Sequence, residues 1–107
     1  MQDSIEAKLI KLSERLSEIE KQLIEESSTL NQDDLISLNK EFSHIQPIVD
    51  LYSKYLKVLD ENTQAISLSK SDENEIKELA QIEVEETENS MNEILGELKL
   101  MLLPVDE

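Results

Sequence analysis

His44 is the residue best suited to chemistry in this chain, because it is the only histidine among 107 residues. It stands three residues after Glu41 in the tetrapeptide EFSH, which has the Glu-x-x-His spacing used by di-iron carboxylate bundles. Such a centre needs two of these pairs, and the chain has only one. The apolar pattern also places His44 at a polar position of a helix, so we predict a solvent-exposed histidine and no metal centre.

The acidic segments do not supply a metal site either. EVEETE, at residues 83–88, contains no histidine, and SDENE, at residues 71–75, lacks the glycine that a calcium loop needs for its sharp turn. The absence of cysteine excludes thiolate ligands and disulfides. We therefore predict solvated acidic faces, with no metal ion and no cofactor.

Covalent and nucleotide-dependent catalysis find no support in the sequence. The serines have no histidine or lysine arrangement that would activate a nucleophile. A single glycine excludes the glycine-rich loops that bind phosphates. The chain is accordingly not expected to be an enzyme.

Lys8, Lys11 and Arg15 are the cations with the most suggestive spacing, since they recur at i, i+3 and i+7 and form a positive stripe on one helix. Pairing along the same helix, Lys11 with Glu14 or Arg15 with Glu18, would explain them as surface ion pairs. The alternative is a contact to phosphates or to an acidic partner. The stripe is our candidate partner-binding site.

The net charge narrows the choice of partners. The chain has 25 acidic and 10 basic side chains, a formal charge of −15, and nucleic-acid phosphates repel it at long range. DNA is therefore not expected as a partner, and contact with RNA is expected only through a local basic stripe or a basic protein.

The N-terminal MQDSIEAKLI lacks the apolar core of a signal peptide, and no apolar run approaches the roughly 20 residues of a membrane span. We expect a cytoplasmic protein that binds no membrane.

Three long helices are predicted to position these side chains. Residues of a mainly apolar seam recur at steps of three and four over about 3–26 and 33–67, and in a weaker form over 73–103, as in a coiled coil. The seam residues are Ile5, Leu9, Leu12, Leu16, Ile19 and Leu23; Leu35, Leu38, Phe42, Ile45, Val49, Tyr52, Leu56, Leu59, Thr63 and Ile66; and Ile76, Ala80, Val84, Thr87, Met91, Ile94, Leu98 and Met101. Short connections favour antiparallel neighbours. We predict an all-α fold in which residues 1–107 form a single domain, an elongated antiparallel three-helix bundle that is coiled-coil-like, with an extended dimeric coiled coil as the alternative.

The second helix contains a proline within its apolar pattern. A second apolar flank of Ile48, Leu51 and Tyr55 predicts that this is the central helix, packed against two neighbours. Pro47 lies on the polar side of the seam, where it removes one backbone N–H and crowds a carbonyl, at a cost of about 3 kcal/mol in an ordinary helix interior. We predict a water-facing proline that kinks the central helix near Pro47. A loop at 44–47 that separates two helices is the alternative.

Polar residues mark where the second and third helices begin. Asn31 together with Asp34, or Asp33 alone, would cap the second helix by accepting hydrogen bonds from its free N–H groups. Asp72 and Glu75 have the spacing of a capping box at the start of the third helix, with Asp in place of the usual Ser or Thr.

The last helix is predicted to carry Gly96 on its water-facing side and to end at Pro104. Apolar residues surround almost the whole circumference of its final turns: Leu98, Leu100, Met101, Leu102 and Leu103. Exposed apolar surface of this extent normally marks an interface. Leu100, Met101 and Leu103 are our candidate inter-domain contact, and self-association of the isolated chain is expected. The alternative is a last turn buried within the bundle.

Three motifs in the chain follow one another in a specific order. They look like the patterns I-x-x-K-L-x-x-L-x-x-R, L-x-x-E-(Y/F)-x-x-L-x-P-(I/V)-V and L-L-P-x-D, with isoleucine at residue 45 where the second pattern has leucine. The corresponding residues are Ile5, Lys8, Leu9, Leu12 and Arg15; Leu38, Glu41, Phe42, Ile45, Pro47, Ile48 and Val49; and Leu102, Leu103, Pro104 and Asp106. In this order and spacing the chain resembles, over essentially its whole length, the N-terminal domain of bacterial peptide chain release factor 1, a class I release factor.

The resemblance implies a role in translation termination at UAA and UAG stop codons. The family reads codons with a tripeptide loop and hydrolyses peptidyl-tRNA with a Gly-Gly-Gln loop. A chain with one glycine lacks the latter, so we expect a non-catalytic fragment without the decoding and hydrolysis domains. The partners that the resemblance implies are the ribosome, at the large-subunit stalk base with protein L11 and its rRNA, and release factor 3.

A free-standing coiled-coil interaction or scaffold protein is the alternative to a termination factor. The two hypotheses differ in what the reading frame encodes after Glu107, since a downstream Gly-Gly-Gln motif belongs only to the first.

Overall fold

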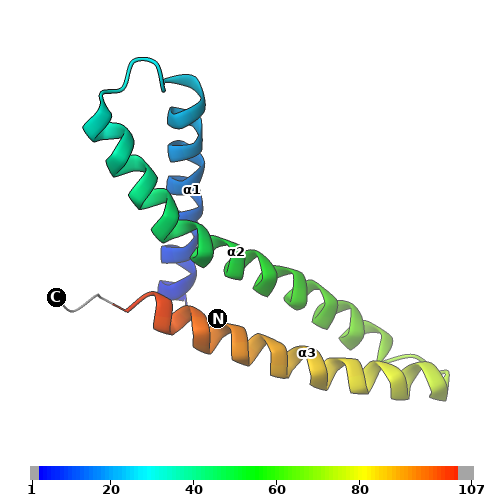
Figure 1. The fold of residues 1–107 in the computed structure, drawn as a ribbon. Helices are drawn as coiled ribbons and strands as arrows, with labels where there is room; N and C mark the ends of the chain where they lie inside the picture. Colours follow the sequence, from blue (N-terminus) through cyan, green and yellow to red (C-terminus); the bar gives the residue numbers. More distant parts are fainter. Residues whose placement is uncertain (1–2, 104–107) are drawn as a thin grey trace. The chain divides into compact units, whose positions relative to one another are not determined.

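The computed structural model describes residues 3–103. Among them it contains three α-helices and no strand: α1 (Asp3–Glu25), α2 (Gln32–Leu68) and α3 (Asn74–Met101) (Figure 1). The predicted all-α class is confirmed, and the helix ends lie within two residues of the expected ones. None of these three helices combines the length and the apolarity that a bilayer span requires. The predicted helix stop at Pro104 lies outside the described residues, as does Asp106 of the third motif.

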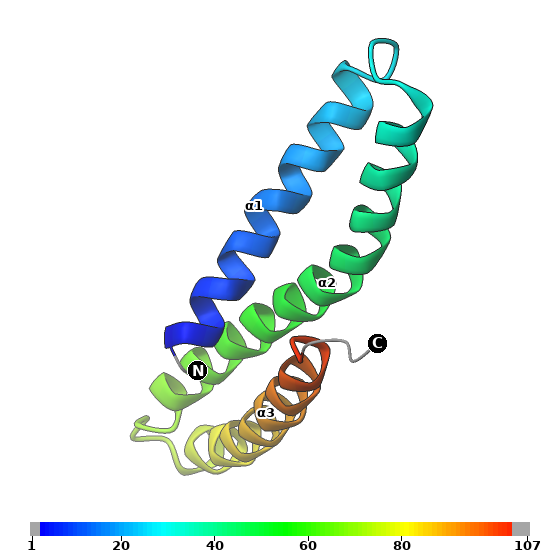
Figure 2. The ribbon, with the colours of Figure 1, turned by 90° about the vertical axis from the view of Figure 1, so that its left-hand side faces the viewer.

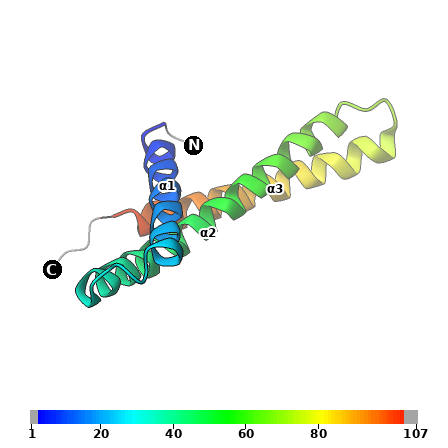
Figure 3. The ribbon, with the colours of Figure 1, turned by 90° about the horizontal axis from the view of Figure 1, so that it is seen from above.

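The chain divides into two compact units within α2, Met1–Asp50 and Leu51–Glu107. In the N-terminal unit the chain turns back after α1, so that α1 and the first half of α2 lie side by side and antiparallel (Figures 1 and 2). In the C-terminal unit the second half of α2 and α3 form a second antiparallel pair (Figure 3). Our expectation that residues 1–107 act as one domain stays a prediction.

The core of the N-terminal unit follows the predicted seam. Leu16, Ile19 and Ile45 are buried together. The partly buried residues packed against them are Leu12, Leu23, Leu38, Phe42 and Val49. Each fully buried aliphatic side chain contributes about 1.5–3 kcal/mol relative to leaving it in water, so this cluster is what holds α1 against α2.

The turn of the N-terminal unit is built by backbone and side-chain hydrogen bonds. The carbonyl of Glu26 accepts from the N–H groups of Thr29 and Leu30, at 2.9 and 3.1 Å. Asn31 Oδ1 then accepts from the N–H of Asp34 at 2.8 Å, which is the geometry of an N-cap. Of the two predicted caps, Asn31 is the one that forms.

In the C-terminal unit α3 buries residues of its predicted seam, whereas the second half of α2 departs from its own. Leu56, Leu59 and Ile66 are exposed, and so is Thr63. The residues that α2 buries in this unit are Tyr52, Tyr55, Asn62 and Ala65, and those of α3 are Ala80, Thr87, Ile94 and Leu98. The neighbour of α2 in this unit is α3, and the side chains that meet α3 lie on a different flank of α2 from the predicted seam. The side of α2 that contains Tyr55, which belongs to the second predicted flank, is buried instead.

A buried polar pair joins α2 to α3. Asn62 Nδ2 donates to Thr87 Oγ1 at 2.9 Å, and also lies 3.5 Å from the carbonyl of Val84. The Thr87 hydroxyl in turn reaches the carbonyls of Glu83 and Val84, at 2.8 and 3.0 Å. The Asn62 amide nitrogen and the Thr87 hydroxyl are both hydrogen-bonded, and no fully buried side-chain nitrogen or oxygen among the described residues lacks a partner. A slip of either helix along the other would break this set of bonds.

The predicted capping box at the start of α3 is wrong. The N-cap is Glu73, with extended backbone and no side-chain cap hydrogen bond, and its N–H donates to Ser71 Oγ at 3.2 Å. Because the helix begins one residue later than a cap at Asp72 requires, the third helical position falls on Ile76. An apolar side chain there cannot complete a capping box.

Pro47 lies inside α2 and is exposed, as predicted. The alternative of a loop at 44–47 is wrong, because α2 is helical without interruption through these positions. The kink itself stays a prediction.

Residual dipolar couplings would measure the kink directly. Fitting residues 33–43 and 51–66 as separate helices should give axes more than about 20° apart, since proline is one of the causes of sharp helix bends. Pro47→Ala restores the missing N–H and should bring the two axes close to collinear. Equal angles in the two proteins would show that Pro47 does not bend α2.

Gly96 is exposed in α3, as predicted, and a Cβ built on it would meet no atom within 4 Å. Gly96→Ala should therefore raise the free energy of unfolding by about 0.5–1 kcal/mol, because alanine loses less backbone entropy than glycine when a helix forms. Urea denaturation followed by circular dichroism measures the change. A loss of stability would mean that the backbone at Gly96 needs a freedom that alanine lacks.

Candidate interaction surfaces

Arg15, the last residue of the cationic stripe, is held by two carboxylates in the N-terminal unit. Its guanidinium donates two hydrogen bonds to the Glu41 carboxylate of α2, one from Nε and one from Nη2, which lies 2.9 Å from Oε1. Nη1 also lies 3.3 Å from Glu18 Oε2. Fork-to-fork pairing of this kind fixes orientation as well as charge. Arg15 thus links α1 to α2 through Glu41. The predicted ion pair between Arg15 and Glu18 also forms.

The Arg15–Glu41 ion pair changes the pKa of both side chains. The hydrogen bond from Arg15 holds the pKa of Glu41 below its ordinary value, and the hydrogen bond to Glu41 raises the pKa of Arg15. A carboxyl group whose folded-state pKa is depressed stabilises the protein above its unfolded pKa, and this stabilisation is lost as the pH falls through the folded pKa.

Glu41→Gln should therefore cost stability only above acidic pH. At pH 7 the loss should be at most about 1 kcal/mol, because both side chains are 37% exposed and water screens the pair. Below the depressed pKa of Glu41 the variant and the parent should have equal free energies of unfolding. Glu20→Gln, at an exposed position of the same unit, is the matched control and should change the free energy of unfolding at pH 7 by less than about 0.5 kcal/mol. A difference that persists at low pH would contradict the assignment.

Lys8 and Lys11 are exposed on α1, so two of the three stripe residues present their charge to solvent. The predicted ion pair between Lys11 and Glu14 is not formed within residues 3–103, where the ion pairs are those of Arg15. The stripe is therefore a pair of lysines beside a neutralised arginine. Its role in partner binding stays a hypothesis.

The end of α3 presents part of the apolar surface that the sequence predicted. Leu100 is 69% and Leu103 61% exposed, whereas Met101 is half-buried and Leu98 is buried. Two of the three candidate residues are therefore accessible, and the inter-domain contact proposed for them stays a hypothesis.

His44 is exposed, as predicted. Within residues 3–103 no three histidine, cysteine, aspartate or glutamate side chains gather in a way that could hold a metal ion.

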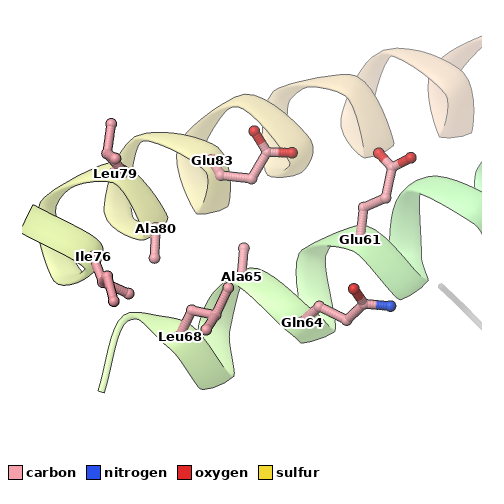
Figure 4. A pocket seen from close by; sticks show the side chains of 8 residues that line it. All are labelled: Glu61, Gln64, Ala65, Leu68, Ile76, Leu79, Ala80 and Glu83. Atoms are coloured by element: carbon pink, nitrogen blue, oxygen red, sulfur yellow. The ribbon is translucent and has the colours of Figure 1, made fainter. Parts of the chain in front are cut away.

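A groove near the turn of the α2–α3 hairpin has a volume of about 370 Å³. Its lining comes from both helices: Glu61, Gln64, Ala65 and Leu68 of α2, and Ile76, Leu79, Ala80 and Glu83 of α3. Figure 4 shows Ala65 and Ala80 pointing toward one another across the floor, with Leu68 and Ile76 beyond them on the side of the turn. Glu61 and Glu83 flank the opposite end.

The groove exists because its floor is made of alanines. Ala65 and Ala80 are only 3% and 5% exposed, so their methyl groups lie between the helices. These side chains are too short to reach the surface, and the space above them stays open. Leu68 and Leu79 remain 55% and 68% exposed at the rim. The sequence pattern did not predict this groove, because Ala65, Leu68 and Leu79 lie off the predicted seams. No pattern within one helix could have found it, because the groove is formed only where α2 and α3 pair.

A second hollow of about 310 Å³ adjoins the groove on α3, lined by Glu75, Glu78, Leu79 and Ile82. Leu79 belongs to both hollows. The apolar side chains on this part of α3 are therefore bordered by carboxylates, none of which forms an ion pair with another described residue.

Comparison with known proteins gives a consistent result. The family model described as the PCRF domain matches residues 12–107. Over 97 residues the chain is 38% identical to peptide chain release factor 1 of Chloroherpeton thalassium, an alignment that covers 90% of this chain and 27% of that protein. The chain thus spans about a quarter of the length of the curated relative it matches. No solved structure matches it.

Proposed function

Because the chain belongs to the PCRF domain family, we propose that it is the N-terminal domain of a translation release factor and serves peptide chain termination. The predicted resemblance to the N-terminal domain of release factor 1 is confirmed by the PCRF match together with the 38% identity to a release factor 1. The observation that carries the proposal is the match over residues 12–107 together with 38% identity to a release factor 1.

The domain's own part in termination is non-catalytic in this proposal. Its role is to contact the ribosome at the large-subunit stalk base, near protein L11 and its rRNA, and to take part in the action of release factor 3, in the cytoplasm. Stop-codon reading at UAA and UAG and peptidyl-tRNA hydrolysis belong to other parts of the factor. The acidic character of the chain supports contact with basic ribosomal proteins rather than broad contact with RNA.

Truncation of the full-length factor tests this division of labour. A factor without residues 1–107 should still release peptide at UAA and UAG on saturating ribosomes, but it should no longer respond to release factor 3. Peptide release from defined termination complexes, with and without release factor 3, measures both properties. Complete loss of hydrolysis in a folded truncated factor would contradict a non-catalytic role.

Charge reversal at Lys8 and Lys11 tests the stripe. In the full-length factor, Lys8→Glu with Lys11→Glu should weaken ribosome association several-fold, and the effect should shrink as salt rises. Arg15 is left intact, since its replacement would also break the pair with Glu41. Lys54→Glu with Lys57→Glu is the matched control, because these lysines are exposed on α2 and carry the same charge. Equal affinities for all three proteins across salt concentrations would exclude the stripe.

A further inference from the structure

The groove of the α2–α3 hairpin has no occupant within the described chain, although it is built like a docking site. Its floor and turn-side end are apolar, and its other end carries Glu61 and Glu83. We propose that this groove binds an amphipathic, positively charged helix of a partner protein. The inference concerns a surface apart from the lysine stripe, and it does not depend on release activity.

The volume of the groove limits how the partner is held. About 370 Å³ is near the lower end of the roughly 300–1,000 Å³ of sites that enclose a small ligand. This space accommodates a few aliphatic side chains but not a helix backbone. A partner helix would therefore lie over the groove and insert residues spaced at i, i+3 or i+4, and i+7 onto Ala65 and Ala80.

The carboxylates determine the charge of the partner. Glu61 and Glu83 flank the groove, and Glu75 and Glu78 line the adjoining hollow that shares Leu79. All four are exposed and lack an ion pair among the described residues, so their charges are available to lysine or arginine. Lys77 is exposed on the same helix but lines neither hollow.

Other occupants conflict with this charge arrangement. RNA and anionic lipid would bring phosphates against the four carboxylates, and like charges held close together in an interface cost several kcal/mol. A second copy of this chain would bring a surface of net charge −15 against the same carboxylates. A basic amphipathic helix satisfies both the apolar floor and the acidic rim.

A designed peptide tests the proposal with the 107-residue chain. The probe has about 18 residues, long enough for a helix, with leucines along one face and lysines elsewhere. We expect binding by calorimetry, with amide shifts in the NMR spectrum centred on Ala65 and Ala80. The same peptide with glutamates in place of lysines should not bind.

Three variants assign the binding to the groove. Leu79→Ser should weaken binding at least tenfold, and since this side chain is 68% exposed the fold should persist. Glu61→Gln with Glu83→Gln should weaken it several-fold and reduce its salt dependence. The matched control is Glu85→Gln with Glu86→Gln, which removes the same charge from exposed positions of α3 outside both hollows and should change the affinity less than twofold. Circular dichroism verifies folding of each variant.

Several outcomes would overturn the proposal. Equal weakening by the control pair would show non-specific attraction to an acidic protein. Binding of the glutamate peptide, or of a single-stranded RNA that Leu79→Ser abolishes, would identify a different partner class. Self-association of the chain that depends on Leu79 would identify a second copy as the occupant. None of these results bears on peptide release, which the truncation experiment measures separately.

Discussion

Replacing Ile19 by alanine is expected to lower the free energy of unfolding by about 2–5 kcal/mol, because the substitution removes buried methyl groups and leaves a cavity. Ile19 is 0% exposed and forms the core of the N-terminal unit with Leu16 and Ile45. Whole domains are stable by only about 5–15 kcal/mol, so the loss is a large fraction of the total. Urea denaturation monitored by circular dichroism measures it, and hydrogen exchange should show the loss in α1 and in residues 33–50.

Ile24→Ala is the matched control for this experiment. The chemical change is the same and the residue lies on the same helix, but Ile24 is 80% exposed. Its effect should stay within about 0.5 kcal/mol. Equal losses for the two variants would mean that α1 does not pack against α2 through the face that contains Ile19.

Replacing Asn62 by aspartate is expected to cost about 3 kcal/mol at neutral pH, although the two side chains have nearly the same size. The carboxylate would be only 7% exposed and could donate no hydrogen bond to the Val84 carbonyl or to Thr87 Oγ1. An unsatisfied buried polar group costs about 1–3 kcal/mol, and more when it is charged. The exchange therefore weakens the pairing of α2 with α3.

The pH dependence of this variant identifies the cause. Burial disfavours the charged form of the new carboxyl group, so protonation at acidic pH should return part of the lost stability relative to the parent at the same pH. Asn89→Asp, an exposed substitution on α3, should change stability by less than about 0.5 kcal/mol. A neutral effect of the change at residue 62 would show that water or a local shift satisfies the carboxylate and that the pair does not set the helix register.

The sequence pattern predicted only part of the interaction surfaces. The cationic stripe was visible in the spacing of Lys8, Lys11 and Arg15, yet the pattern could not show that Arg15 is bound by Glu41, 26 residues away. A partner at that distance along the chain is decided by how two helices pack. The groove was invisible for the same reason, since its floor needs Ala65 and Ala80 to face each other.

The sequence by itself determined the three helices, the N-terminal seam, the exposure of His44, Pro47 and Gly96, and the family. These properties depend on local periodicity, on capping by Asn31 and on motif order, which act within a few turns of one helix. The tertiary structure alone decided which face of the second half of α2 is buried. Two flanks compete there, and pairing with α3 buries the flank with Tyr55, Asn62 and Ala65 and leaves Leu56, Leu59 and Ile66 exposed. A search for apolar periodicity does not predict burial of Asn62 and Ala65. Close packing favours a hydrogen-bonded amide and a small methyl group where two helices meet.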